Sequence, residues 1–353
     1  MVTLPEMRSS NPTIKDVARL AGVSPMTASR VANGLENVRP EKRDAVVRAM
    51  RELNYAPHAA AQSMRTQKTR RIGFMLPDIT NITNAIVSLA VERHLAQDRY
   101  HLMMFNTDFQ TAIERDVFAM GGHNMFDGLI AALSDDTDPS VATALDASPI
   151  PVVLIDRDCG IEVDAVLSDH RTAMRTIVQQ LAHLGHRRIA LIAPSRTIRP
   201  GRERVEGFVA ALTELGIPVL HDLIWADDQS IQFGRQVTAR MMSLPDPPTA
   251  LIAGANQLTM GAYQALRELE VSIPDELSFV GSDDPYLASL LSPPITVIYR
   301  DMEMVGRNAA DLILQRLRGA AGLAPRLITV PSEIALRSSI APARPRTLPR
   351  RKR

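Results

Sequence analysis

The chain has 353 residues, of which 45% are hydrophobic and 22% are charged, a balance typical of a globular protein with two or three structural units. The longest apolar runs have the length of a strand, which excludes a membrane-spanning helix of about 20 apolar residues. Cys159 is the only cysteine, which excludes an intrachain disulfide and a cysteine-based zinc module. Because residues 1–10 lack the apolar core of a signal peptide, we expect a protein of the reducing cytoplasm.

The net charge of +1 is distributed unevenly along the chain. Residues 1–71 hold 13 Lys and Arg against 6 Asp and Glu, a net charge of +7. Residues 72–336 hold 20 against 33, a net charge of −13, and residues 337–353 hold 7 against 0. A basic segment ahead of an acidic body favours a polyanion such as nucleic acid as the partner of that segment, although a solvated charged surface would produce the same counts.

From residue 12 onward the sequence predicts a series of short helices. Thr13 and Asp16 have the spacing of a capping box at a helix start. Apolar residues then recur at helical spacing up to Gly22, a residue type that ends helices by adopting a left-handed backbone. Ser24 is a preferred N-cap residue, and Pro25 suits the first turn of a helix. These residues predict a helix, a tight turn and a second helix that begins at once.

The second predicted helix ends early, at Asn33-Gly34, and a third helix follows with a proline in its first turn. Two short helices joined by a glycine-containing turn and packed against a third are typical of a helix-turn-helix. Any small three-helix bundle, however, has the same signals for the start and end of its helices. Such a short helix is not stable alone, but it can project its N-terminal side chains into a major groove. Thr27 and Arg30 can bond phosphates or base edges, and Met26 can contact a thymine methyl.

The segment after the predicted bundle contains a helix-prone run at residues 59–65 that is too short to be stable alone. Such a segment can become ordered on DNA and insert Met64 into the minor groove; a plain linker is the simpler interpretation. We therefore predict a DNA-binding domain at residues 12–58 and a hinge at residues 59–69.

The rest of the chain alternates between strand-like and helix-like segments. Short apolar runs that predict buried strands are RIGFML, YHLMMF, GLIAAL, PVVLID, RRIALIA, TALIAG and LSFVGS. Helical patterns that follow several of them are 84–97, 170–184, 203–215 and 256–269. Buried strands separated by helices indicate parallel sheets covered on both faces. We predict a domain at residues 70–340 with two doubly wound lobes, the first at 70–168 plus 298–335 and the second at 169–297; the resemblance described next implies that this domain binds an effector and dimerises.

Residues 13–69 resemble the DNA-binding head and hinge of the LacI/GalR family of bacterial repressors. The matching segments are TIKDVARLAGVSPMTASRVANG, VRPEKRDAVVRAMRELNYAPHAAAQSMR and RRIGFMLPD, and the similarity extends to about residue 337. The resemblance implies an all-α helix-turn-helix head and an α/β body with two lobes of the type I periplasmic-binding-protein kind. It also implies a cytoplasmic, nucleoid-associated homodimer that represses genes for the catabolism of a sugar or related carbon source.

The resemblance implies two partners, a palindromic operator in double-stranded DNA and a small hydroxylated effector between the lobes. The residues that we expect to contact the operator are Thr13, Ser24, Pro25, Met26, Thr27, Ser29, Arg30, Asn33, Tyr55, Ala61 and Met64. Met64 stands where the family usually has leucine. Since two heads read a palindrome, we expect the segments near 84–97 and 284–292 to form a dimer interface. We expect no cofactor, no metal and no membrane partner.

Ligands of open α/β sheets bind outside the carboxyl ends of the strands, so a cleft between two lobes should collect the residues that follow them. The effector contacts that we expect there are Asp78, Asn81, Thr83, Asn84, Asp156, Arg157, Arg202, Arg204, Gln229, Asn256 and Asp283. Carboxylates and amides that bond hydroxyls, with an arginine in bidentate reach, suit a sugar-like ligand. The arginines would equally suit a phosphate or a carboxylate, or pair with Glu203 and Glu206 on the surface. Arg204 matches the arginine that the family most regularly turns into its cleft.

Three positions depart from the family pattern. The segment NITN at residues 81–84 replaces the common Asn-Pro-Phe-Phe, and Gln229 lies near the position of a common aromatic residue. Gln257 stands where aspartate is usual. Trp225 could substitute for the missing aromatic, but we favour a packing role for it. These departures predict a cavity with more hydrogen bonding than is typical of the family.

Two other classes of protein remain open at this point. A solute-binding protein has the same two lobes, although residues 12–69 and the missing signal peptide argue against it. A sugar-processing enzyme could use Asp156, Asp283 or Asp284 as acid and base, but no nucleophile elbow, P-loop or GxGxxG follows a predicted strand, so we expect no enzyme activity. Residues 341–353 are rich in Arg and Pro and predict a disordered basic tail.

Overall fold

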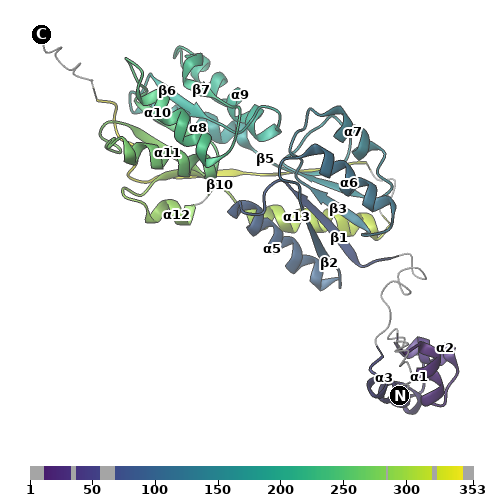
Figure 1. Ribbon diagram of the computed structural model, residues 1–353. Coiled ribbons are helices and arrows are strands. Elements are labelled where there is room, and N and C mark those ends of the chain that lie inside the picture. The colour runs from purple at the N-terminus through teal and green to yellow at the C-terminus, as the bar shows by residue number, and fades with distance from the viewer. Residues whose placement is uncertain (1–11, 33–36, 56–67, 284, 320–323, 345–353) are drawn as a thin grey trace, which may run out of the picture. The chain divides into compact units, whose positions relative to one another are not determined.

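The structure is a computed structural model that describes residues 12–32, 37–55, 68–283, 285–319 and 324–344. It divides into two units, Met1–Thr69 and Arg70–Arg353, whose ribbons are drawn in Figure 1. The first unit contains the predicted helix-turn-helix and the second contains the predicted α/β body. Residues 56–67, which hold most of the predicted hinge, lie outside the described residues.

The described residues of the first unit form three short helices, α1 (Ile14–Leu20), α2 (Pro25–Ala32) and α3 (Pro40–Glu52). The Asp16 carboxylate accepts hydrogen bonds from the Thr13 backbone N–H at 3.0 Å and from the Thr13 hydroxyl at 2.7 Å, which holds the first turn of α1. Gly22 turns the chain with a φ of +64°. The Ser24 hydroxyl then accepts from the Thr27 N–H at 3.2 Å and caps α2.

The core of the first unit is small. Its buried side chains are Val17, Ala18, Ala28, Val46 and Ala49, and Tyr55 packs against them from the segment after α3. Helix α2 contributes only Ala28 to this set, so the orientation of α2 depends on its packing against α1 and α3 and not on its own helical propensity.

The second unit contains two six-stranded sheets. Sheet A has the order β11 (Leu327–Val330), β5 (Asp164–Ser168), β4 (Val152–Ile155), β3 (Gly128–Ala131), β1 (Arg71–Leu76) and β2 (His101–Asn106). Sheet B has the order β12 (Ser332–Ala335), β10 (Thr296–Arg300), β9 (Ser278–Ser282), β8 (Ala250–Ala253), β6 (Ile189–Ile192) and β7 (Ile224–Trp225). Every neighbouring pair is parallel except β10 with β12. The carboxyl ends of the parallel strands therefore gather at one edge of each sheet.

Helices pack on both faces of each sheet (Figure 1). Sheet A is covered by α5 (Ile82–Gln97) and α13 (Met302–Leu317) on one face and by α6 (Thr111–Gly122) and α7 (Pro139–Asp146) on the other. Sheet B is covered by α8 (His170–His183) and α9 (Arg199–Glu214) on one face and by α10 (Ile231–Met242) and α11 (Asn256–Glu268) on the other. A short helix, α12 (Pro285–Leu290), follows β9. Strands buried on both faces explain the near-continuous apolar runs in the sequence. Each sheet with its helices is called a lobe, lobe 1 for sheet A and lobe 2 for sheet B.

The structure differs from the predicted return of residues 298–335 to lobe 1. Strand β10 pairs in parallel with β9, and β12 pairs with β10, so both ends of that segment belong to lobe 2. Only α13 and β11 lie in lobe 1. The apolar pattern of β10 predicts a buried strand correctly, but it does not tell which of the two sheets the strand joins.

The chain consequently crosses between the lobes three times, after β5, after β10 and after β11. Ser168 at the first crossing is paired with Val330 at the third. Arg300 at the second crossing is paired with Ser332 at the third. The three crossings therefore lie side by side and form the interlobe hinge on which any change of lobe closure depends.

Residues 341–344, predicted as the start of a disordered tail, pack against lobe 2 instead. The Ala343 N–H donates to the Leu184 carbonyl at 2.8 Å, and the Ala341 carbonyl lies 3.0 Å from Nε2 of the buried His186. Arg344 pairs with Asp275 at 2.6 Å. Residues 345–353 lie outside the described residues.

Candidate effector cavity and DNA-contacting helix

A cavity lies between the lobes, at the carboxyl ends of both sheets. The predicted effector residues that line it are Asn81, Thr83, Asn84, Asp156, Arg157, Arg204, Gln229, Asn256 and Asp283. Its volume is about 90 Å³, which is below the roughly 300 Å³ at which pockets for small organic ligands begin. The lobes are therefore in a closed arrangement, and a sugar-sized ligand requires them to part.

Two predicted effector residues, Asp78 and Arg202, do not line this cavity. Asp78 accepts a hydrogen bond of 2.9 Å from the Gln257 side chain, and Arg202 donates one of 3.1 Å to Asp136. Each of these bonds joins lobe 1 to lobe 2. The structure thus places Asp78 and Arg202 at the rims of the cleft, where they connect the lobes, and not among the side chains that line the cavity.

Two carboxylates on the cavity stand directly after strands and have an unusual backbone. Asp156 follows β4 with a φ of +51°, and Asp283 follows β9 with a φ of +76°. Their N–H groups donate to Val166 and Ile298 carbonyls at 2.9 and 2.8 Å, respectively. Aspartate tolerates this left-handed region better than most residues, and such a conformation at a cavity is typical of functional sites.

Asp156 is the centre of a buried polar cluster near the interlobe hinge. Its carboxylate accepts from the Ser168 N–H at 2.6 Å and from the Ser168 hydroxyl at 2.8 Å. It also lies 3.4 Å from Arg300, 3.5 Å from His170 and 3.6 Å from Arg199. Burial acts to raise the pKa of Asp156, but the charge of Arg300 and the hydrogen bonds from His170 and Ser168 hold that pKa well below its ordinary value. The carboxylate is therefore ionised at neutral pH.

His170, at the start of α8, is buried beside Asp156. Burial, together with repulsion from Arg204, lowers the pKa of His170 to about 3. The ring is consequently neutral at physiological pH. The sequence reasoning missed His170, because a histidine in the first turn of a helix carries no signal for a buried site until the tertiary packing is known.

Arg204 and Arg300 supply the positive charge of the cavity. Arg300 donates to Asp283 at 2.9 Å, whereas Arg204 lies 3.9 Å from the same carboxylate and donates to the Pro200 carbonyl at 3.3 Å. Burial lowers the pKa of Arg204 to about 10, so it remains charged at neutral pH. Sequence reasoning missed Arg300, although its place at the carboxyl end of the strand TVIYR was a usable signal.

The remaining lining of the cavity is aliphatic. It includes Ile155, Ile198, Met302 and Val305, and among the described residues no aromatic side chain lines it. Trp225 lies elsewhere: it packs with the core of lobe 2 and stacks with the guanidinium of Arg240 at 4.7 Å. A ligand here would be held by hydrogen bonds and aliphatic contacts and not by stacking on a ring.

Helix α2 presents a mixed surface to solvent. Pro25, Met26 and Arg30 are exposed, Met26 to 67%, and Thr27 and Ser29 are half-buried. Thr13 and Ser24 are engaged in the helix caps described above, and Tyr55 packs against the three-helix core. The other three predicted DNA contacts, Asn33, Ala61 and Met64, lie outside the described residues. Of the DNA contacts predicted on α2, Pro25, Met26 and Arg30 are therefore fully accessible, and Thr27 and Ser29 are partly accessible.

A helix-turn-helix unit, together with a two-lobed body whose cavity gathers strand-end side chains, defines a DNA-binding regulator that responds to a small ligand. Residues 13–58 match the model of bacterial regulatory proteins of the lacI family. Residues 178–340 match a periplasmic binding protein-like domain. In the described part of the chain, no helix is both long and apolar enough to span a membrane.

Individual relatives align with this chain over nearly its whole length. The HTH-type transcriptional repressor PurR of Actinobacillus pleuropneumoniae is 30% identical over 93% of this chain and 98% of its own length. Catabolite control protein A of Priestia megaterium is 29% identical over 93% and 99%. The lac repressor dimer bound to its operator and an anti-inducer superposes with a TM-score of 0.84 at 26% identity, over 94% of this chain and 100% of that one. A complex of the regulator CelR with cellobiose superposes with a TM-score of 0.70 at 27% identity, over 93% and 99%.

The chain belongs to the LacI family of bacterial transcriptional regulators. It is a ligand-responsive DNA-binding regulator and not an enzyme.

Proposed function

We propose that this chain represses genes for the catabolism of a sugar or a related carbon source, and that a small hydroxylated effector bound between its lobes controls its affinity for an operator. The observation that carries this proposal is the polar lining of the cavity, where buried carboxylates, guanidinium groups and amides meet. A hydroxyl group both donates and accepts hydrogen bonds. A polyhydroxy ligand can therefore satisfy Asp283, Arg204 and Asn84 together.

The relatives support both partners of this chain. One similar structure holds cellobiose and another holds operator DNA, which supports a carbohydrate effector and an operator here. The aliphatic and polar lining of the cavity favours a ligand recognised through hydroxyl groups over a flat aromatic one, because a flat ring finds no stacking partner among the described lining residues.

For the operator, we propose direct contacts from the start of α2. Met26 and Arg30 are exposed there, and their side chains suit a thymine methyl and a phosphate or guanine edge. Thr13 and Ser24 hold the first turns of α1 and α2, and Tyr55 packs against the three-helix core. DNA binding supports a cytoplasmic, nucleoid-associated location.

A palindromic operator requires a homodimer, and exposed apolar side chains support one. On lobe 1 the exposed apolar side chains include a group on or just before α5, namely Ile79, Ile82, Ile86 and Leu89. On lobe 2, Tyr286, Leu287 and Leu290 of α12 are exposed to 75%, 49% and 67%. Both groups fall within or beside the segments that the sequence suggested for dimerisation.

Effector control follows from lobe closure. The small cavity requires the lobes to part for a ligand to enter, and a ligand that fits one degree of closure better than another shifts the population of the two. A coupling free energy of about 1–3 kcal/mol, the usual range for allostery, changes operator affinity about 5–150-fold.

The test combines a gel shift with a thermal-shift screen. The purified full chain is incubated with the DNA upstream of its own gene, with and without a panel of ribose, cellobiose, gluconate and glucose 6-phosphate. We expect a retarded band that at least one compound weakens or strengthens, and an increase in melting temperature with the same compound. Arg30→Ala should lose the band and keep the thermal shift, whereas Arg204→Lys should keep the band and lose the thermal shift.

Two other outcomes would point to a different class of protein. A sugar that stabilises the chain without any DNA retardation would point to a solute-binding protein. Consumption of a sugar from the panel would revive the enzyme hypothesis.

A further inference from the structure

The two rims of the cleft are closed by different chemistry. At one rim, the Asn256 side chain donates to Asn81 at 2.9 Å, and the Gln257 side chain donates to Asp78 at 2.9 Å. Each of these pairs is a single bond from a neutral amide. At the other rim, several cross-lobe contacts meet at one carboxylate, that of Asp136 in the loop after β3, and Arg202 also donates to the Asp158 carbonyl at 3.2 Å. The lobes are therefore joined by single hydrogen bonds from neutral amides at one rim and by a buried carboxylate with arginine partners at the other.

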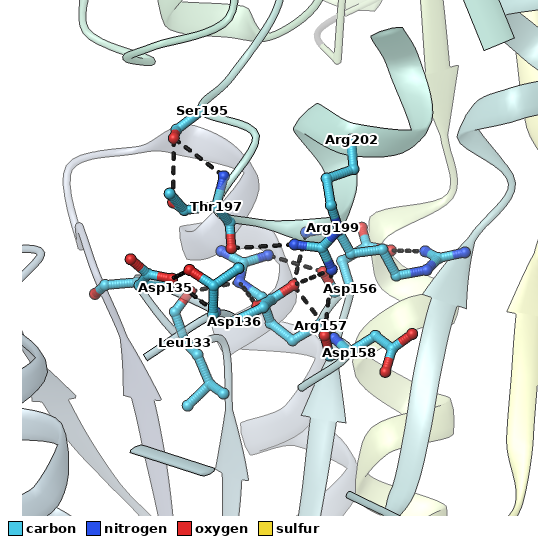
Figure 2. Close-up of polar contacts among 12 residues, drawn as sticks. Leu133, Asp135, Asp136, Asp156, Arg157, Asp158, Ser195, Thr197, Arg199 and Arg202 are labelled. Atoms are coloured by element: carbon cyan, nitrogen blue, oxygen red, sulfur yellow. Dashed lines mark hydrogen bonds and ion pairs between the residues drawn. The ribbon is translucent and has the colours of Figure 1, made fainter. Parts of the chain in front are cut away.

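Asp136 of lobe 1 contacts three positions of lobe 2, and Figure 2 shows the cluster. Its carboxylate accepts from the Arg199 N–H at 2.6 Å and from the Arg202 side chain at 3.1 Å. Its own N–H donates to the Thr197 carbonyl at 2.9 Å. Its side chain is fully buried, although its partner Arg202 is 29% exposed. Asp136 is thus buried at a place where residues of lobe 2 contact it directly.

The lobe 2 side of this rim has a tight backbone. A Cβ at Gly201 would lie 2.1 Å from the Ser195 carbonyl oxygen, so only glycine allows the first turn of α9 to approach the loop after β6. This close approach sets the positions of the Arg199 N–H and the Thr197 carbonyl relative to each other. The surface that meets Asp136 is therefore already shaped within lobe 2.

Asp136 also holds a residue of the effector cavity. Arg157, which lines the cavity, places its Nε 3.5 Å from Asp136, and it donates to the Leu133 carbonyl and, at 3.0 Å, to the Asp156 carbonyl. All of these partners belong to lobe 1. The orientation of Arg157 in the cavity is therefore linked, through one carboxylate, to contacts that exist only when the lobes are closed.

The free-energy cost of burying Asp136 suits a contact that opens and closes with the lobes. Removing a carboxylate from water is costly, and a buried ion pair often only breaks even against that cost. Burial raises the pKa of Asp136 despite the charge of Arg157 and the hydrogen bonds from lobe 2, which indicates that the desolvation cost is the larger effect. A contact whose partners only partly offset the cost of burial can be made or broken by a modest change elsewhere.

We propose that Asp136 is a positioning residue that ties Arg157 of the effector cavity to lobe 2 and holds the body closed when no effector is bound. The inference rests on the proposed function only in naming the cavity as the effector site. The closure itself can be measured without any effector or operator.

Hydrogen exchange of the ligand-free full chain, followed by mass spectrometry, tests this inference. The Arg199 N–H is protected by its bond to Asp136, so peptides that cover residues 195–199 report closure at this rim. In Asp136→Asn we expect the Arg199 amide in these peptides to exchange about tenfold faster or more, the change expected when a hydrogen bond to a charged group is weakened. Peptides from β3 and β6 should exchange as in the wild type.

Asp135→Asn is the matched control. Asp135 is the neighbouring carboxylate, and it accepts hydrogen bonds from the N–H and hydroxyl of Thr137 in its own loop, so this variant should leave residues 195–199 unchanged. Arg202→Gln removes the charged partner from lobe 2 and should accelerate the same peptides, even if Asp136→Asn fails to fold. The double variant should change exchange by less than the sum of the two single ones, because both lose the contact between Arg202 and Asp136.

Two results overturn the inference. Wild-type exchange at residues 195–199 in both Asp136→Asn and Arg202→Gln would show that the rim closes without this carboxylate. An equal acceleration in β3, β6 and the rim would show that Asp136 supports the folding of the lobes and not their closure. A failure to find any stabilising sugar would leave both readouts intact, so it would count against the proposed function alone.

Discussion

Arg300 donates a hydrogen bond of 2.9 Å to Asp283, and the two residues stand at the ends of the neighbouring strands β10 and β9. The same guanidinium lies 3.4 Å from Asp156, which follows β4 in the other lobe. One arginine therefore neutralises two strand-end carboxylates, one in each lobe, at the place where the chain crosses between them. Closure of the lobes and the electrostatics of the cavity depend on the same side chain.

Replacing Arg300 with Met should destabilise the body strongly. The change leaves Asp156 and Asp283 buried with fewer cationic partners, and breaking a buried pair in this way typically costs about 3–5 kcal/mol. Urea denaturation of the full chain at pH 7 measures the loss. Arg240→Met, at an arginine that stacks on Trp225 away from the cavity, is the control and should cost much less. A loss below about 1 kcal/mol, the scale of an exposed ion pair, would contradict the proposed role.

His170 should make stability fall as the pH is lowered. Its pKa is about 3 in the folded protein because of burial, whereas the unfolded chain binds the proton near the ordinary value of about 6.5. Protons therefore favour the unfolded state between these limits, with a slope of roughly 1.4 kcal/mol per pH unit. This contribution is fully present above the unfolded pKa and is lost as the pH falls toward 3.

The measurement is the difference in unfolding free energy between wild type and His170→Asn from pH 7.5 to pH 4.5. We expect the wild type to lose its advantage progressively below about pH 6.5. His123→Asn changes an exposed histidine and should run parallel to the wild type. Parallel curves for His170→Asn would mean that His170 is charged in the native protein.

Substitutions of Ser24 and Met26 should distinguish residues that stabilise the first unit from residues that recognise DNA. Ser24→Ala removes the cap of α2 and should cost about 1 kcal/mol in the opening free energy of that helix, measured by native-state hydrogen exchange. Met26→Ala removes a side chain that is 67% exposed, so stability should be unchanged while affinity for the operator fragment falls. Full operator affinity in Met26→Ala would place the base contacts elsewhere on α2.

Leu89 on α5 should be needed for dimerisation. Leu89→Lys puts a charge into the proposed apolar interface, so sedimentation velocity should show a monomer, and operator affinity should fall with it. Leu269, at the end of α11, has the same exposed fraction of 48% as Leu89 and lies outside the proposed interface, so Leu269→Lys should remain dimeric. Dimers of both variants would move the interface away from α5.

Local sequence signals determined much of this protein. The helix caps at Thr13 and Ser24, the turn at Gly22 and the apolar runs of the strands each depend on residues a few positions apart. Asp156 and Asp283 were also predicted, because a polar residue directly after a buried parallel strand lies at the ligand-binding edge of its sheet. In these cases the residues that cause the structure are close together in the sequence, so a short sequence pattern is enough to predict it.

Only the tertiary structure decided the rest. The apolar pattern of β10 fits either sheet, and its pairing with β9 moved Arg300 into the cavity at the hinge. Asp136 and His170 carry no local mark of their roles, because their burial is created by contacts with residues far away in the chain. Short-range preferences select helices and strands, whereas the pairing of distant strands and the burial of charge depend on how the lobes pack together, which no short segment encodes.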